Sequence, residues 1–200
     1  MKSYYAIAVV LVIALAVVGY AAISGFILQA PFDGSPPKVD QSRIDAVTAS
    51  AMAWLAGSMG SDRFPAGILA SPIAVFAENS SAGNYSVDHW VLPVVNSEGM
   101  YIGFFSSKGD SFTTPGNDMI YPEPRHNLFS MTKEDAYTQM FYKNPYLSNQ
   151  IKEPFLSAVG GRGYAWTSNV VVNGQKVGVL NVFVSIIDPS PADNKIKSDS

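Results

Sequence analysis

Few residues of this chain could carry out chemistry. It has two histidines and no cysteine, and it contains no HExxH, GxSxG, P-loop or EF-hand motif. His89 follows Asp88, but neighbouring side chains of a strand point to opposite faces, so we expect Asp88 to be poorly placed to orient His89. His126 lies in a proline-containing loop sequence, YPEPRHN. We expect both histidines to be structural, and the sequence predicts no catalytic residue and no cofactor.

One metal alternative stays open. Asp110, Asp118 and Glu123 share one loop region with prolines, and carboxylate and carbonyl oxygens are the ligands that Ca²⁺ prefers. We expect a solvated loop there rather than a metal site. The absence of cysteine excludes disulfides, thiolate metal sites and thiol catalysis.

A long loop, predicted over Ser106 to Met131, is the best candidate for function. It exceeds the length that a compact domain needs between elements, and its aromatic and proline content indicates order. Aromatic side chains together with arginine are enriched at binding hot spots. The residues predicted to bind a partner are Phe112, Tyr121, Arg125 and Phe129. The alternative is that they pack the loop onto its own domain.

Two similar units must position these residues. Apolar side chains at three-to-four spacing predict a helix over 42–58, and a second helix is expected to begin at Thr132 and end before Pro145. Each helix start has a hydroxyl followed three residues later by Asp, which predicts an N-cap. A strand, turn and strand follow each helix, over 90–103 and 166–187.

The fold class that follows is α+β, with two helix-plus-hairpin units on an antiparallel sheet. Asn173-Gly174 predicts a type I′ turn in the second hairpin. The stretch Ser61 to Tyr85 is interpreted as an insertion in the first unit. The expected divisions of the chain are an anchor over 1–30, a linker over 31–40, a domain over 41–188 and a polar tail over 189–200.

The first residues predict a membrane segment. Tyr4 to Leu28 carries no charge and as a helix would be about 37 Å long, enough to cross a lipid bilayer of ~30 Å. The sequence therefore predicts a single-pass transmembrane anchor, with the following domain outside the cytoplasm. The alternative is a secretory signal cleaved near Ala22. Two sequons, at Asn79 and Asn84, are candidates for glycosylation of an exported domain.

The charge balance excludes one class of partner. The net charge is −3 and lysines and arginines form no cluster, whereas the phosphates of nucleic acids require a basic face. We therefore expect no nucleic-acid binding.

Two family resemblances bear on function. The helix near Asp45-Ala46, the hairpin from Trp90 to Gly103 and the turn Lys108-Gly109-Asp110 resemble the PepSY module, mainly over 42–112. That resemblance implies an extracytoplasmic binding or inhibitory module without catalysis. The stretch GGRGYAW, which opens the region 160–187, more faintly resembles Cache-type sensor domains, which bind small ligands.

The sequence thus favours a non-enzymatic, membrane-anchored interaction module, either an accessory subunit of a membrane or cell-surface assembly or a PepSY-like modulator, with a protein partner in the membrane or cell envelope. The first alternative is a small-ligand sensor domain that acts through a membrane partner. The second is a hydrolase with an unrecognised site.

Overall fold

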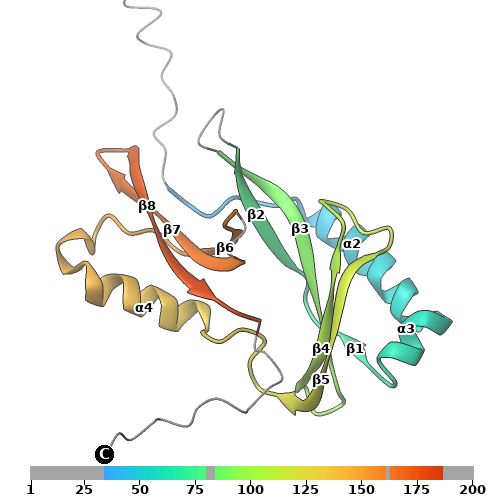
Figure 1. Ribbon diagram of the computed structural model, residues 1–200. Helices are drawn as coiled ribbons and strands as arrows, with labels where there is room; N and C mark the ends of the chain where they lie inside the picture. Colours follow the sequence, from blue (N-terminus) through green and yellow to red (C-terminus); the bar gives the residue numbers. More distant parts are fainter. Residues whose placement is uncertain (1–33, 80–83, 161–162, 187–200) are drawn as a thin grey trace, which may run out of the picture.

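The computed structural model describes residues 34–79, 84–160 and 163–186. They form an α+β fold built on one eight-stranded sheet (Figure 1). The helices are α2 (Gln41–Ala56), α3 (Ser58–Arg63) and α4 (Lys133–Lys143), followed by the 3₁₀ turn η1 (Pro145–Leu147). The strands are β1 (Ile68–Leu69), β2 (Ile73–Asn79), β3 (Asn84–Val95), β4 (Tyr101–Ser107), β5 (Pro115–Arg125), β6 (Phe155–Ala158), β7 (Tyr164–Val172) and β8 (Gln175–Val184).

The sheet consists of two antiparallel halves joined by one parallel pair. Its order is β5-β4-β3-β2-β6-β7-β8, with the short β1 paired to β3. Among the described strands only β2 and β6 run parallel, with Phe76 opposite Ser157. The first half therefore comprises β1 to β5 and the second half comprises β6 to β8.

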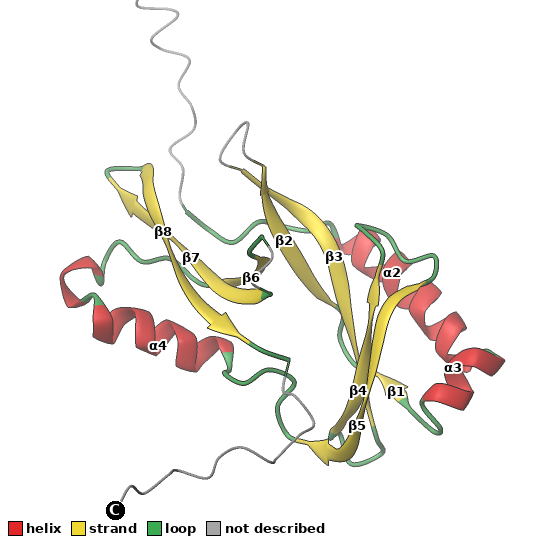
Figure 2. Cartoon of the chain, in the orientation of Figure 1, coloured by secondary structure: helices red, strands yellow, loops and turns green. Residues whose placement is uncertain are grey.

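The two long helices lie on opposite faces of this sheet. On β3, Trp90 and Leu92 belong to the core under α2, whereas Val91 belongs to the core under α4. This alternation follows from the two-residue period of a strand. Figure 2 shows α2 beside β3 and β4, and α4 beside β7 and β8. Each helix thus covers one half of one face.

The predicted α+β class is confirmed, but the transmembrane part of that prediction is corrected. Within 34–79, 84–160 and 163–186, no helix is long and apolar enough to cross a membrane. The longest, α2, has 16 residues and would span only about 24 Å, and it carries charged side chains. Tyr4 to Leu28, on which the single-pass anchor was predicted, lies outside the described residues. The predicted tail over 189–200 also lies outside them.

Two segments differ from the sequence-based interpretation. The supposed insertion Ser61 to Tyr85 supplies β1 and β2, and β2 is a central strand of the sheet. The supposed loop Ser106 to Met131 contains the edge strand β5. The strand was not predicted because its sequence, PGNDMIYPEPR, contains three prolines, which lack a backbone donor. A sheet tolerates such residues mainly at an edge, and β5 is an edge strand.

The predicted turn at Asn173-Gly174 and the predicted N-cap of the second helix are confirmed. Asn173 and Gly174 have φ of 51° and 74°, as a type I′ turn requires. Thr132 is the N-cap of α4, and its hydroxyl accepts from the amide of Asp135 at 3.1 Å. At α2 the predicted hydroxyl cap, Ser42, is wrong, because the N-cap is Asp40, two residues before the predicted start of the helix, and its side chain makes no capping bond.

This contrast between the caps gives a test. Thr132→Ala should lower the free energy of unfolding by about 1 kcal/mol, because an orphan amide of α4 loses its acceptor. Asp40→Ala should cost on the order of 0.3 kcal/mol, because only the interaction of its charge with the helix dipole is lost. Urea unfolding of both variants measures the difference. Equal losses at the two positions would contradict the assigned caps.

Candidate functional site

The four residues predicted to bind a partner do not form one exposed surface. Phe112 is buried beneath α2 against Trp54 and Phe105. Tyr121 and Phe129 are buried in the other core, on the α4 side of the sheet. These aromatic side chains are therefore interior packing of two separate clusters, the alternative that the sequence left open.

Arg125 is the least buried of the four, and it remains beside Tyr121. Its guanidinium carbon lies 5.0 Å from the centre of the Tyr121 ring. This distance is within the range of a cation–π contact, so Arg125 lies over a ring of its own strand, β5.

The glycosylation candidates Asn79 and Asn84 are exposed and lie opposite each other at the end of the β2–β3 hairpin. Their modification stays a prediction.

Two of the three acidic residues considered as metal ligands form ion pairs. Asp110 binds Arg43 at 2.6 Å, and Asp118 binds Arg63 at 3.0 Å. In the described ranges no group of three or more His, Asp or Glu residues could hold a metal ion.

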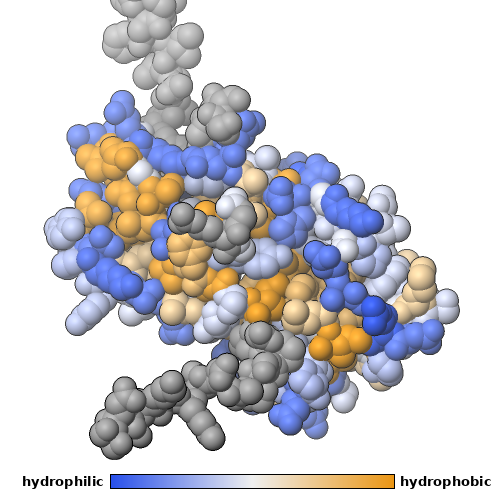
Figure 3. All heavy atoms as spheres, viewed as in Figure 1, coloured by the Kyte–Doolittle hydropathy of each residue, from blue (hydrophilic) through white to orange (hydrophobic). Residues whose placement is uncertain are grey.

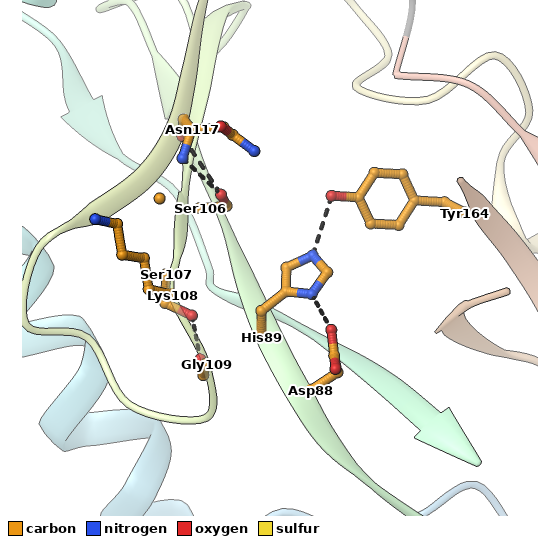
Figure 4. A pocket seen from close by; sticks show the side chains of 9 residues that line it. Asp88, His89, Ser106, Ser107, Lys108, Gly109, Asn117 and Tyr164 are labelled. Atoms are coloured by element: carbon orange, nitrogen blue, oxygen red, sulfur yellow. Dashed lines mark hydrogen bonds and ion pairs between the residues drawn. The ribbon is translucent and has the colours of Figure 1, made fainter. Parts of the chain in front are cut away.

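A polar cavity of about 510 Å³ is the best candidate site (Figure 4). Strands β3, β4 and β5 of the first half of the sheet form most of its lining, and β7 of the second half contributes one side chain. The lining residues are Asp88, His89, Ser106, Ser107, Lys108, Gly109, Gly116, Asn117 and Tyr164. The cavity thus lies where the two halves of the sheet approach each other.

His89 is fixed from both sides within this cavity. Its Nδ1 lies 2.7 Å from Oδ2 of Asp88, and its Nε2 lies 3.0 Å from the hydroxyl of Tyr164. The expectation that Asp88 is poorly placed to orient His89 is therefore wrong.

The reason is a β-bulge. Val75 pairs with His89 and Phe76 pairs with Val87, so Asp88 is an extra residue in β3. A bulge re-aims side chains and breaks the strict alternation of a strand.

Burial affects the titration of Tyr164 in this network. It raises the pKa of Tyr164 above its ordinary value of 10.0, and the charge of Asp88 raises the pKa further. The hydroxyl therefore keeps its proton near neutral pH. The carboxylate of Asp88 can only accept, so Nδ1 of His89 donates to it, and the hydroxyl of Tyr164 lies against Nε2. Both ring nitrogens thus have a partner.

The two serines of the cavity stabilise its walls. Ser107 Oγ accepts from the amide of Trp90 at 2.8 Å and donates to the carbonyl of Gly109. Ser106 Oγ accepts from the amide of Asn117 at 3.1 Å and donates to the carbonyl of the same residue at 3.4 Å. Ser107 thus connects β3 with the turn after β4, and Ser106 connects β4 with β5. Lys108, by contrast, is exposed at this site and supplies a positive charge.

Comparison of the chain with protein-family models, with curated proteins and with solved structures found no match. The PepSY-like and Cache-like resemblances therefore stay predictions.

Tyr121 is a second tyrosine whose environment has a measurable consequence. Its hydroxyl is buried and has no hydrogen-bond partner among the described residues. Burial raises its pKa to about 12, although the positive charge of Arg125 acts in the opposite direction. The folded state therefore holds the Tyr121 proton up to a higher pH than the unfolded state does. The resulting stability is complete below about pH 10 and is lost as the pH rises through 10 to 12.

Tyr121→Phe should remove part of this alkaline loss. At pH 7 the same change should raise the free energy of unfolding by up to about 1 kcal/mol, because a buried hydroxyl without a partner is removed. Urea unfolding at pH 7 and across pH 10–12 tests both effects. Tyr142→Phe is the control, because Tyr142 is 87% exposed. A Tyr121→Phe variant that matches the unmodified protein across the alkaline range would disprove the assignment.

Proposed function

We propose that this domain binds a small polar ligand in the His89 cavity. The observation that carries the proposal is the fixed arrangement Asp88–His89–Tyr164, which lines an open volume of about 510 Å³. A volume of this size lies within the range of small-molecule sites, which are concave and hold a few well-placed polar groups.

The hydrogen bonds of the cavity favour binding over catalysis. A general base needs a ring nitrogen that can reach the proton it removes. Both nitrogens of His89 are already engaged, and both serine hydroxyls bond to backbone groups. In this arrangement the side chains that line the cavity are held as recognition groups rather than aligned as a nucleophile and its base.

The charges of the cavity favour one class of ligand. Lys108 offers an ammonium group that attracts an anion, and Asp88 offers a half-exposed carboxylate that accepts from a hydroxyl or amino group. The carboxamide of Asn117 can both donate and accept. The ligand that fits best is a small molecule with one carboxylate or phosphate group together with hydroxyl or amino groups, such as an amino acid, a hydroxy acid or a sugar acid.

The position of the cavity supports a sensing role. A ligand that contacts both Lys108, which follows β4, and Tyr164 of β7 bridges the two halves of the sheet. Such a ligand would stabilise one relative arrangement of the halves, which is how a binding event is transmitted through a folded domain.

The proposal is tested by thermal unfolding with amino acids, hydroxy acids and sugar acids. At a hundred times its dissociation constant, a true ligand should add about 2.7 kcal/mol to the free energy of unfolding. His89→Ala and Tyr164→Phe should each weaken binding at least tenfold, or by about 1.4 kcal/mol, because each removes a hydrogen bond that holds the Asp88–His89–Tyr164 arrangement in place.

The matched control is His126→Ala. His126 is the other histidine of the chain, is exposed and does not line the cavity, so its removal should leave binding unchanged. The proposal fails if no compound of these classes raises the melting temperature, or if the His89 and His126 variants bind equally well.

A further inference from the structure

A second cavity, of about 530 Å³, shares no lining residue with the His89 cavity. It opens between α2, α3 and the start of β5, so its walls come from the first half of the sheet and the two helices before it. Figure 3 shows apolar atoms beside strongly hydrophilic ones over the part of the molecule where α3 and β5 lie. The side chains that matter for binding are those of Trp54, Met59, Asp62, Arg63 and Asp118.

Trp54 supplies an aromatic wall that is held in place. Its ring lies against Phe105, with ring centres 4.5 Å apart, and Phe112 meets it edge-on at 6.4 Å. Both phenylalanines are buried in the core under α2, whereas Trp54 is only partly buried and also lines the cavity. The cavity therefore has a rigid aromatic surface on one side.

Met59 completes the apolar part of the lining. It is 71% exposed, although its side chain is large and apolar. A methionine side chain adapts its shape to an apolar partner, and its sulfur makes favourable contacts with aromatic rings. Trp54 and Met59 together offer a place for the carbon skeleton of a small molecule.

The charges of the lining leave one carboxylate unbalanced. Asp118 lies opposite Phe105 of β4, so its side chain points to the α2 side of the sheet, and only 27% of that side chain is exposed. Arg63 neutralises it through an ion pair of 3.0 Å. Asp62 is exposed and makes no ion pair or hydrogen bond within the described ranges. The lining thus carries a net charge of about −1 near neutral pH.

We propose that this cavity binds a small organic cation with an aromatic or aliphatic body. A cation over a tryptophan ring is attracted by the negative face of the ring, and the carboxylate of Asp62 adds to this attraction. The apolar body of the ligand lies against Met59. This site differs in charge from the His89 cavity, whose proposed ligand carries a carboxylate or a phosphate, and it does not depend on that proposal.

NMR titration of the full chain tests the proposal. The probes are phenethylammonium, 2-phenylethanol and 3-phenylpropanoate, which have similar shapes but are a cation, a neutral molecule and an anion. The chain has three tryptophans and so gives three indole N–H signals, of which Trp54→Phe identifies one. Phenethylammonium should shift the Trp54 signal and leave those of Trp90 and Trp166 in place, because these two do not line the cavity. It should bind more tightly than the alcohol, and the anion should bind most weakly.

Charge variants test the same site. Met59→Lys should weaken phenethylammonium binding on the order of tenfold, because a like charge replaces an apolar contact. Asp62→Asn should weaken it about two- to fivefold, since the attraction of an exposed carboxylate is partly screened. The matched control is Glu98→Gln, because Glu98 is exposed but does not line the cavity. His89→Ala should leave this binding unchanged, which keeps the test separate from the ligand of the His89 cavity.

The proposal is overturned if phenethylammonium leaves the Trp54 signal unchanged, or if 3-phenylpropanoate binds as tightly as phenethylammonium. It is also overturned if Asp62→Asn and Glu98→Gln have the same effect on binding. The comparison of the three probes uses the unmodified chain, so it decides the question even if a variant fails to fold.

Discussion

The parallel pairing of β2 with β6 is the contact on which the other features of this fold depend. It joins two antiparallel halves that are otherwise sequential in the chain. Aromatic packing supports the junction on one face, where Phe155 contacts Phe76 with ring centres 5.7 Å apart and Tyr85 with ring centres 4.7 Å apart. Val75 and Leu156 are buried together in the core on the other face. Such edge-to-face pairs add about 0.5–1.5 kcal/mol each beyond the burial of area.

The candidate site is a consequence of this junction. The halves meet so that Tyr164 of β7 reaches His89 of β3, and the bulge at Asp88 turns a second polar side chain toward the same ring. His89 itself is largely buried, with 18% of its side chain exposed. A buried polar group is tolerated when its hydrogen bonds are made, and here both ring nitrogens have partners. The network therefore both stabilises the join and shapes the cavity next to it.

The opposite placement of α2 and α4 has a related consequence. Because each helix covers only half of a face, other groups must cover the rest. The loop before α4 does so in part, since the indole of Trp166 donates to the carbonyl of Met131 at 3.0 Å and Phe129 packs on the same ring. The outer strand β8 keeps two large apolar side chains exposed. In the described part of the chain, β5 and β8 are the two edges of the sheet.

What the sequence by itself determined is local: the α+β class, the hydroxyl cap of α4 and the Asn173-Gly174 turn, because neighbouring residues alone decide caps and turns. The tertiary structure decided the rest. It buried Phe112, Tyr121 and Phe129, because exposure depends on what packs above a side chain. It placed β2 in the centre of the sheet, although the sequence analysis had interpreted Ser61 to Tyr85 as an insertion. It brought together His89 and Tyr164, which are 75 residues apart, through a bulge and a parallel pairing that no short-range pattern encodes.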